Sequence, residues 1–505
     1  AMKILSAEQT RAVDAFTIQN EPIAGIDLME RAAMACFRRL IKLIRLEEEV
    51  IVFCGKGNNG GDGLAIARLL IEQGFDCKTI VVNYKEHFSP DAEINFKRLI
   101  EKYQSRVLEI NSAEALLQIG AEKNTVIIDA LTGTGISKAL EGLLAEVIIF
   151  LNKNFKKIIS IDLPSGLFPD ASSKDNKAVV RSALTLTLQL PKLAMMMAEN
   201  KKYVPEFEIL DIGLNASAIE ANNSGYHYVT KKDISTLLKP RDKFSHKGQF
   251  GHALLLAGSK GKSGAALISA RACLRSGAGL LTVHSTLETL NALSIALPEA
   301  MSEQDPRTDF ISEVNHPENY EAIAFGPGVG LEEDTQLVLK KILQYYTGKL
   351  LIDADGLNIL SENKTWLTFL PPNSILTPHP KEFERLTEKH EDDFEQLKAA
   401  KHFSMKNNCI VVLKGAHTAI VMPDGNVFFN SSGNPGLAKG GSGDGLTGII
   451  LGLLSRGYNE PKSALIGTFI HGFAADLCIG KKSMESLLIS DVIETLGKAF
   501  KKLEK

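Results

Sequence analysis

The residues best suited to chemistry lie in a glycine-rich stretch, residues 432–448, which read SGNPGLAKGGSGDGLTG. Eight of these seventeen residues are glycine or proline, and an apolar segment with helical spacing, Ile449 to Leu454, follows at once. This order predicts a loop that leads into a helix N-terminus, where unpaired backbone N–H groups carry partial positive charge. Gly440, Gly441 and Gly443 would let an anion such as a phosphate approach that backbone.

One acid, Asp444, stands at the mouth of this predicted anion site. Its carboxylate could take a proton from a substrate hydroxyl while a nearby phosphoryl group is transferred. The alternative is that Ser442 or Asp444 only caps the helix, which is the usual role of such residues. Seven glycines around one acid are more than a cap needs, so we favour the anion site.

A second glycine stretch, GKGNNGGDG at residues 55–63, follows the short apolar run Val50 to Cys54 and precedes a helical pattern. The run is typical of a buried parallel strand, so the order is strand, glycine turn and helix, as in nucleotide-binding α/β units. The spacing matches G-x-G-x-x-G, with Asp76 as a possible ribose-binding acid. Taken alone this match is weak, because the Asn58-Asn59 pair places side-chain amides where a phosphate turn needs only backbone.

Polar side chains end or follow three separate strand candidates in the first half: Asn59, Asp129 and Ser165. Their oxygen atoms suit a weakly held monovalent cation, and Asp162 remains as a candidate acid or base. The alternative, that each residue separately forms a cap or a turn, stays open.

Three motifs in the second half also follow strand candidates. The glycines of residues 326–330, GPGVG, could let a ligand approach the backbone. The segment TPHPKE at 377–382 places His379 and Glu382 at a strand end, where His379 is as compatible with a structural role as with a catalytic one. The segment Lys414 to Thr418 could contact a nucleotide phosphate or an adenine edge.

Short apolar runs alternate with helical patterns along the whole chain, which indicates doubly wound parallel sheets. A helical pattern covers Ser6 to about Arg45, and Asn215 to Gly225 is the best candidate for a linker between two α/β series. The expected strands are Val50–Cys54, Thr79–Val82, Thr125–Ile128, Lys157–Ile161, Leu184–Leu190, Phe207–Gly213, His252–Ala257, Ala322–Phe325, Leu350–Asp353, Ser374–Leu376 and Cys409–Leu413. Ligands of such sheets bind beyond the carboxyl ends of the strands, so the polar loops should converge there.

The 505 residues exceed what one core supports, and a net charge of −3 gives no basic excess for nucleic acid or a membrane surface. The six cysteines lack C-x-x-C spacing, which favours a reducing compartment. The N-terminal residues lack an apolar core, and no later apolar run is close to the ~18 residues of a membrane span. We therefore expect a cytoplasmic protein that binds neither nucleic acid nor a membrane.

The motif set resembles two known enzyme families, in order along the chain. The second half is similar to the ADP-dependent NAD(P)H-hydrate dehydratases, which have a ribokinase-like fold, at Ser245–Gly248, Gly326–Gly328, Thr377–Pro380, Lys414–Ala416 and Gly436–Asp444. The first half is similar to the NAD(P)H-hydrate epimerase domain at Leu28–Ala32, Asn58–Gly63, Gly133–Gly135 and Asp162–Gly166. The resemblance implies two doubly wound α/β domains, a Rossmann-like one at 1–222 and a ribokinase-like one at 223–505.

The resemblance also implies the ligands and their contacts. A potassium ion would lie on Asn59, Asp129 and Ser165. The hydrated cofactor in the first domain would contact Asn58, Asn59, Gly60, Gly61, Asp62, Gly133, Thr134, Gly135 and Asp162, and in the second domain Ala253, Gly328, His379 and Asp444. ADP, with Mg²⁺, would lie on Lys414, Gly415, Ala416, His417, Thr418 and Gly443, with Asp444 as the base and Asp162 as the second catalytic residue.

The implied function is repair of hydrated NADH and NADPH by a homo-oligomeric bifunctional enzyme. The first domain would interconvert the R and S epimers, and the second would dehydrate the S epimer with ADP, giving AMP and phosphate. The same loop and acid would also serve a small-molecule kinase, of a vitamin or a sugar alcohol, for which phosphorylation ends the reaction. In that case, the first domain would be a non-catalytic cofactor-binding module.

Overall fold

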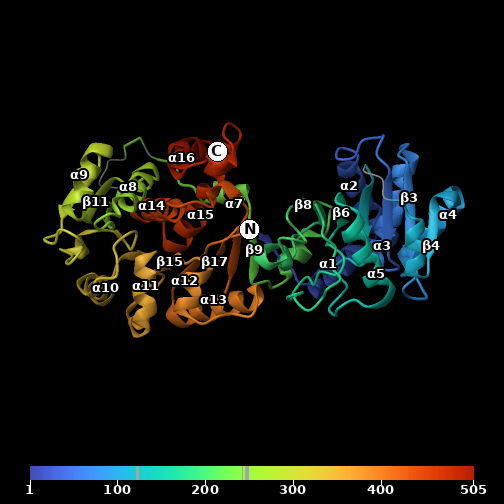
Figure 1. The fold of residues 1–505 in the computed structure, drawn as a ribbon, viewed down its shortest axis with the longest axis horizontal. Helices are drawn as coiled ribbons and strands as arrows, with labels where there is room; N and C mark the ends of the chain where they lie inside the picture. Colours follow the sequence, from blue (N-terminus) through green and yellow to red (C-terminus); the bar gives the residue numbers. More distant parts are fainter. Residues whose placement is uncertain (121–123, 242, 245–249, 505) are drawn as a thin grey trace. The chain divides into compact units, whose positions relative to one another are not determined.

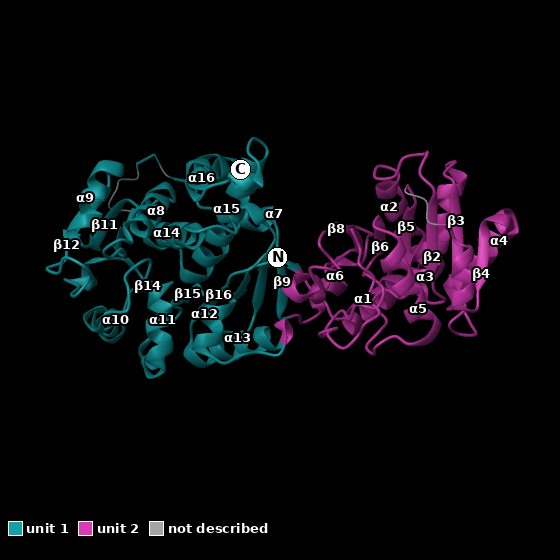
Figure 2. Cartoon of the chain, viewed as in Figure 1, with its two compact units in different colours: residues 1–2, 225–391, 395–505 teal, residues 3–224, 392–394 magenta. Residues whose placement is uncertain are grey.

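The computed structural model describes residues 1–120, 124–241, 243–244 and 250–504. The chain forms two compact units, coloured separately in Figure 2. The N-terminal unit holds residues 3–224 and 392–394, and the C-terminal unit holds residues 1–2, 225–391 and 395–505. The motif Ser245–Gly248 lies outside the described residues.

The N-terminal unit is built on a seven-stranded sheet in which every neighbouring pair of strands is parallel. Strand order reverses between β2 and β5, which makes that position the crevice where open α/β sheets bind ligands. In spatial order the strands are β4 (Val107–Ile110), β3 (Cys77–Val82), β2 (Val50–Cys54), β5 (Val126–Ala130), β6 (Ile158–Ile161), β7 (Leu184–Leu188) and β8 (Phe207–Leu210).

Alternate residues of these strands face two separate cores, as the two-residue period of a strand requires. Val50 and Val52 of β2 pack on one side with α2 and α3, whereas Ile51 and Phe53 pack on the other side with α5. Both faces are covered, so the strands read as continuous apolar runs. The helices of this unit are α1 (Ala7–Asn20), α2 (Gly25–Leu40), α3 (Asn58–Glu72), α4 (Pro90–Tyr103), α5 (Gly142–Asn154) and α6 (Ala216–Ala221).

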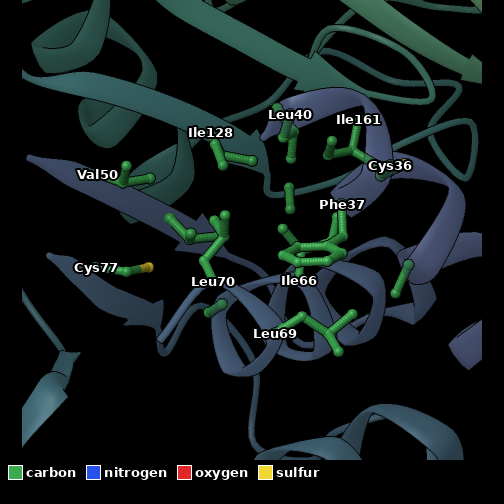
Figure 3. Packing of buried hydrophobic residues seen from close by; sticks show 14 of the residues in the cluster. Cys36, Phe37, Leu40, Val50, Ile66, Leu69, Leu70, Cys77, Ile128 and Ile161 are labelled. Carbon is green, nitrogen blue, oxygen red and sulfur yellow. The ribbon is translucent and has the colours of Figure 1, made fainter. Parts of the chain in front are cut away.

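Figure 3 shows the first of these cores from close by. Its labelled members come from β2, β3, β5 and β6 and from the two helices that cover that face: Val50, Cys77, Ile128, Ile161, Cys36, Phe37, Leu40, Ile66, Leu69 and Leu70. All ten are buried, so this core holds the helix that carries the Asn58-Asn59 motif against the sheet.

The C-terminal unit is built on an eleven-stranded sheet (Figure 1). Neighbouring strands are parallel from β12 through to β16, and the β16–β17 and β17–β18 pairs are antiparallel. In spatial order the strands are β1 (Met2–Lys3), β9 (Tyr226–Val229), β18 (Val427–Asn430), β17 (Ala419–Val421), β16 (Ile410–Leu413), β15 (Ile375–Leu376), β14 (Lys349–Ile352), β13 (Ala322–Phe325), β10 (His252–Leu256), β11 (Leu280–Ser285) and β12 (Met301–Gln304).

Helix α14 is the central helix of this unit. One side of it packs with α8 and the sheet, and the other with α15 and α16. It is apolar almost all round, which is typical of a helix buried on every side. The α-helices described in this unit are α7 (Lys231–Leu237), α8 (Ser263–Arg275), α9 (Leu287–Ala296), α10 (Glu333–Tyr345), α11 (Asp355–Glu362), α12 (Pro380–Leu386), α13 (Asp393–Asn407), α14 (Ser442–Ser455), α15 (Glu460–Ile479) and α16 (Ile489–Leu503).

Helix α15 corrects one expectation from the sequence. It is long and apolar enough to cross a membrane by length and composition, although no such run was expected. Because 67% of that apolar window is buried inside the protein, α15 is accounted for as a core helix that packs on α14 and α16.

The expected pair of doubly wound α/β domains is confirmed, with four local differences. The helical pattern of Ser6 to Arg45 breaks into α1 and α2, because Pro22 has no N–H to continue the first helix. The expected linker, Asn215 to Gly225, contains α6, which Asn215 caps. Asp76 precedes β3, so it lies at the amino end of the sheet, opposite the glycine loop, and pairs with Arg106. Strands β1, β4, β9, β11, β12, β17 and β18 were not expected from the sequence.

The buried face in Figure 3 gives a stability prediction. Leu70 is fully buried there, so Leu70→Ala should lower the free energy of unfolding of the N-terminal unit by about 2–5 kcal/mol, through lost burial and a residual cavity. Leu46→Ala is the matched control, because that side chain is 63% exposed and should change stability by less than about 0.5 kcal/mol. Urea titration of both variants measures the difference, and equal effects would contradict this packing.

Candidate active sites

The glycine-rich stretch of the C-terminal unit leads into α14, as expected from the sequence. The helix begins at Ser442, directly after Gly441, whose φ of +86° is a left-handed conformation that favours glycine. No side chain caps this helix end. The capping alternative for Ser442 and Asp444 is therefore wrong. The N–H of Ser442 is bonded to the carbonyl of Lys439, and in the described structure the N–H groups of Gly443 and Asp444 remain available to an anion.

A charged cluster lies against this helix start. Lys414, just after β16, places its Nζ 3.2 Å from Oδ1 of Asp353, which follows β14, and 3.9 Å from Oε2 of Glu382. The other oxygen of Asp353 accepts a 2.7 Å hydrogen bond from Thr447 of α14. A Cβ built on Gly443 would lie 3.3 Å from the Lys414 ammonium. Glycine at this position thus allows the ammonium to approach the helix backbone.

Asp444 lies in the first turn of α14, beside this cluster. Burial first, and then the Asp353 carboxylate, raise the pKa of Asp444 to about 6, while the Lys414 ammonium acts in the opposite direction. Within the described residues, no hydrogen bond reaches its carboxylate, and only its backbone carbonyl is bonded, to Ser269 Oγ. A half-buried carboxylate with a pKa near neutrality and no fixed partner is suited to act as a general base.

His379 has a structural role in this unit. Its Nδ1 accepts hydrogen bonds from the backbone N–H groups of Lys381 and Glu382, both at 3.2 Å, and so caps α12. Its Nε2 lies 3.5 Å from Glu382 Oε1, and its side chain is 46% exposed, so one ring edge still faces outward. Through Glu382 the cap is joined to Lys414.

The predicted nucleotide segment Lys414 to Thr418 forms the turn between β16 and β17. Thr418 fixes this turn, because its Oγ1 accepts from the N–H of Gly415 and donates to the Gly415 carbonyl. Ala416 is exposed at the tip. His417 is bonded through Nδ1 to the carbonyl of Asn430, and burial lowers the pKa of His417. The ring of His417 is therefore neutral at pH 7.

The structure separates two residues that the resemblance placed on one ligand. Gly328 follows β13 at the carboxyl edge of the sheet, with a φ of +67°. Ala253 lies inside β10, is fully buried, and pairs with β11 and β13. Ala265, in the first turn of α8, is brought beside Gly328 instead, since a Cβ on Gly328 would lie 3.2 Å from its side chain.

In the N-terminal unit, Asp129 ends β5 and is fully buried. Its oxygens accept hydrogen bonds from Ser160 Oγ at 2.7 Å, from the N–H of Ser165 at 2.9 Å and from Ser165 Oγ at 2.5 Å. Burial raises the pKa of Asp129 despite these bonds. No basic side chain in the described ranges forms an ion pair with Asp129, so a buried negative charge there lacks a counter-charge.

Asn59, in the first turn of α3, approaches the same region. Its side-chain amide lies between the N–H of Gly133 and the carbonyl oxygen of Ile161, at 3.1 and 3.2 Å. With the amide nitrogen toward Ile161, both hydrogen bonds form.

The other predicted contacts of the first domain lie at the start of α3 and on the loop after β5. Asn58 is exposed at the start of α3, whereas Gly60, Gly61 and Asp62 are buried. A Cβ on Gly60 would lie 1.9 Å from the carbonyl oxygen of Gly55, so this glycine permits a close approach within the turn. The loop after β5 holds Gly133, which packs on Asn59, and then Thr134 and Gly135, which become progressively more exposed.

Asp162 follows β6 with a φ of +67°, a strained conformation for a residue other than glycine. Its Oδ1 accepts hydrogen bonds from the Lys192 ammonium at 2.5 Å and from the N–H of Leu188 at 3.1 Å. Lys192 is almost fully buried and also donates to Thr187 Oγ1. These bonds hold the Asp162 carboxylate in place at the strand end.

Two further carboxyl groups interact electrostatically with Asp162. Burial, followed by the charge of Asp162, raises the pKa of Asp14 to about 6, and Lys192 opposes this rise. Burial, with Asp162 and Asp14, raises the pKa of Asp62 well above its ordinary value. The site thus contains groups that can hold a proton at neutral pH.

Sequence reasoning missed several charged residues of both sites. Asp353 and Asp355, whose charges both raise the pKa of Asp444, lie in the segment DADG at the end of an expected strand. This signal is as clear as the strand-end residues that were chosen as site candidates. Lys192 follows Pro191, and its role depends on a contact across the fold. Asp14 lies on α1, far from Asp162 in sequence, and no local pattern marks it.

Together, the fold and these sites define a two-domain α/β enzyme whose C-terminal unit places an uncapped helix N-terminus beside the half-buried carboxyl group of Asp444. A family model for NAD(P)H-hydrate dehydratase matches residues 253–498, and a model for the YjeF-related protein N-terminus matches residues 25–194. The two matches cover separate parts of the chain, in the expected order.

Curated relatives cover nearly the whole chain. The bifunctional NAD(P)H-hydrate repair enzyme of Thermofilum pendens is 31% identical over 99% of this chain and 97% of its own length, and that of Moorella thermoacetica is 30% identical over 100% and 97%. A crystal structure of the ADP/ATP-dependent NAD(P)H-hydrate dehydratase from Bacillus subtilis is 31% identical, covers 55% of this chain and 99% of its own, and has a TM-score of 0.48. The chain belongs to the family of bifunctional NAD(P)H-hydrate repair enzymes.

The carboxyl groups around Asp162 give a prediction about proton affinity. Asp162→Asn removes a negative charge, so the pKa of Asp14 should fall from about 6 toward its ordinary value of 3.8. Asparagine tolerates the left-handed backbone at this position, so the fold should persist. Carbon-13 NMR titration of the carboxyl groups measures the shift.

Asp76→Asn is the control, because Asp76 lies at the opposite edge of the sheet and pairs with Arg106. It should leave the pKa of Asp14 unchanged. An unchanged Asp14 in Asp162→Asn would show that the two carboxyl groups do not interact.

Proposed function

We propose that the protein repairs hydrated NADH and NADPH in two domains. Residues 1–222 would interconvert the R and S epimers, and residues 223–505 would dehydrate the S epimer with ADP, giving AMP and phosphate. Family membership supports both activities. The observation that carries the second activity is Asp444, a carboxyl group with a pKa of about 6 and no side-chain partner in the described structure, beside an uncapped helix N-terminus.

The dehydration follows from the chemistry of this arrangement. Hydroxide is a poor leaving group, so the ring hydroxyl must first be converted into a better one. Asp444 takes the proton of the ring hydroxyl. The hydroxyl oxygen then attacks the terminal phosphoryl group of ADP, and AMP is released. The N–H groups at the start of α14 and the Lys414 ammonium stabilise the charge that develops on the phosphoryl oxygens. Phosphate then leaves the ring, a ring proton is lost, and the double bond is restored.

Magnesium fits this site as an ion carried by the nucleotide. Within the described residues, no group of three or more His, Cys, Asp and Glu side chains is placed to hold a metal ion. The nearest carboxylate, Asp353, is already bonded to Lys414 and Thr447. Mg²⁺ would therefore be carried to this site by the phosphate groups of the nucleotide.

Potassium fits the N-terminal site. Asn59, Asp129 and Ser165 bring amide, carboxylate and hydroxyl oxygens to one edge of the sheet, and the buried Asp129 has no basic partner in the part of the chain described. One carboxylate among neutral oxygens suits a monovalent cation better than Mg²⁺, which dehydrates reluctantly. The ion would supply a fixed positive charge next to the cofactor.

Asp162 is the residue we assign to proton transfer in epimerisation. Lys192 and the N–H of Leu188 orient its carboxylate, and Asp14 and Asp62 can hold protons close by. The homo-oligomeric state and the cytoplasmic location remain predictions from the sequence. In agreement with a reducing compartment, all six cysteines are buried and free.

The central experiment mixes the purified protein with hydrated NADH, ADP and Mg²⁺. Reduced nicotinamide absorbance should appear together with free phosphate and AMP. A stable phosphorylated product without NADH would overturn the proposal in favour of a small-molecule kinase.

The first functional prediction concerns Asp444. Because only the carboxylate accepts a proton, the wild-type dehydration rate should fall about tenfold per pH unit below a pH of about 6 and level off above it. Asp444→Asn should keep ADP binding and the fold, lower the rate by about two to four orders of magnitude, and remove this pH dependence. Asp424→Asn, at an exposed turn, is the control. Near-normal turnover by Asp444→Asn would exclude it as the base.

The second concerns Asp129. Asp129→Ala should abolish conversion of R to S, or leave it independent of potassium, while ADP-dependent dehydration of pure S epimer continues. Rates measured in potassium and in a large inert cation check this. Equal wild-type rates in both salts would remove the ion from the mechanism, and R epimer bound without conversion would make the first domain a sensor.

A further inference from the structure

A cavity with several basic side chains in its wall lies in the C-terminal unit, away from Asp444. It has a volume of about 760 Å³, and its walls come from the ends of α7, α8, α14 and α16. Because α14 rises 1.5 Å per residue over 14 residues, this end lies about 20 Å from the glycine loop at its start. The cavity therefore does not belong to the nucleotide site proposed above.

The walls of this cavity are strongly basic. They include Lys239, Arg241, Arg275 and Arg456, against one carboxylate, Glu504. Arg275 pairs with Glu494, at 3.3 Å. Within the described ranges, by contrast, no ion pair joins Lys239, Arg241 or Arg456 to a carboxylate. Three positive charges thus line one cavity without an ion-pair partner in the described structure, and Glu504 is the one carboxylate in the described lining.

Aromatic rings hold these cations close together. The guanidinium groups of Arg241 and Arg456 lie 4.1 and 5.9 Å from the centre of the same ring, Phe250. Lys239 lies over Tyr458, whose hydroxyl also accepts from Arg456. The backbone is shaped for this approach, because a Cβ on Gly277 would meet Arg456 at 2.8 Å and Arg241 at 3.3 Å. Burial and the charge of Arg456 lower the pKa of Arg241, which shows the cost of this arrangement.

Backbone carbonyls of the wall hold both arginines in place. Arg241 donates to the carbonyl of Gly277, and Arg456 donates to the carbonyl of Lys239. Among the described residues, each guanidinium group keeps further N–H donors that have no partner. These donors are on the same wall of the cavity.

We propose that this cavity is a binding site for a phosphate-bearing small molecule, held by Arg241, Arg456 and Lys239. Guanidinium groups match phosphate oxygens through paired N–H donors, and the anion supplies the missing counter-charge. Leu238 and Phe500 add an apolar wall, which suits the ring of a nucleotide. This proposal does not depend on the catalytic function proposed above.

The test titrates inorganic pyrophosphate into the full-length protein by calorimetry. Arg241→Gln is the first variant, because this exposed side chain makes its hydrogen bond only to Gly277 and its loss should leave the fold intact. Its pyrophosphate affinity should fall about tenfold or more, as expected for lost charge-assisted hydrogen bonds. Arg456→Gln should act in the same direction.

Two controls separate this site from others. Arg307→Gln removes an arginine that also lies over a phenylalanine ring, Phe310 at 5.8 Å, but outside the cavity, and it should bind pyrophosphate normally. Gly443→Val blocks the glycine loop and should retain the binding that Arg241→Gln loses. Titrating ATP into Gly443→Val distinguishes a nucleotide, which binds more tightly than pyrophosphate, from a free inorganic anion.

Three results would overturn the proposal. They are absence of pyrophosphate binding in the wild type, unchanged affinity in folded Arg241→Gln and Arg456→Gln, and complete loss in Gly443→Val. Any of them would mean that Arg275 and Arg456 only stabilise the carboxyl ends of α8 and α14, where cations are favourable.

Discussion

The ion pair between Lys414 and Asp353 is the contact on which the C-terminal site depends. It joins the ends of β16 and β14, and Thr447 ties the same carboxylate to α14. The ammonium is thereby fixed beside Gly443, where positive charge from the side chain and from the helix N-terminus add together. The same carboxylate helps to keep the pKa of Asp444 near 6. One buried contact thus sets both the anion site and the base.

The N-terminal unit solves a different electrostatic problem. Asp129 is completely buried among hydroxyl and N–H donors with no basic partner in the described structure, so its charge is stabilised only in part. Asp162, by contrast, is held by the buried Lys192. Asp129 therefore lacks a positive counter-charge. Asp162 already has one in Lys192, and needs only a group with which to exchange a proton.

Parallel strands explain why both sites could form from distant segments. All carboxyl ends of neighbouring parallel strands meet at one edge, so residues such as Asp353, Thr377 and Lys414 become neighbours although dozens of residues separate them in sequence. The loops at that edge carry the chemistry, and the buried helices hold them in place.

The sequence by itself determined the two α/β series, the glycine loop before α14 and the polar ends of most central strands. These features are local, since apolar runs, glycine clusters and strand-end acids can be read within a few residues. It failed at the helix break at Pro22, which lies inside an otherwise helical pattern, and at the edge strands, which are short or partly polar. Asp76 was misplaced because spacing alone does not say at which end of a strand a residue lies.

Only the tertiary structure decided which charges meet. Lys192 forms an ion pair with Asp162, and the charge of Asp162 raises the pKa of Asp14 on α1. Ala265, and not Ala253, lies beside Gly328. Each of these depends on burial and on contacts between segments far apart in the chain. Burial shifts proton affinities and leaves arginines without counter-charges, and neither effect exists until the chain has folded.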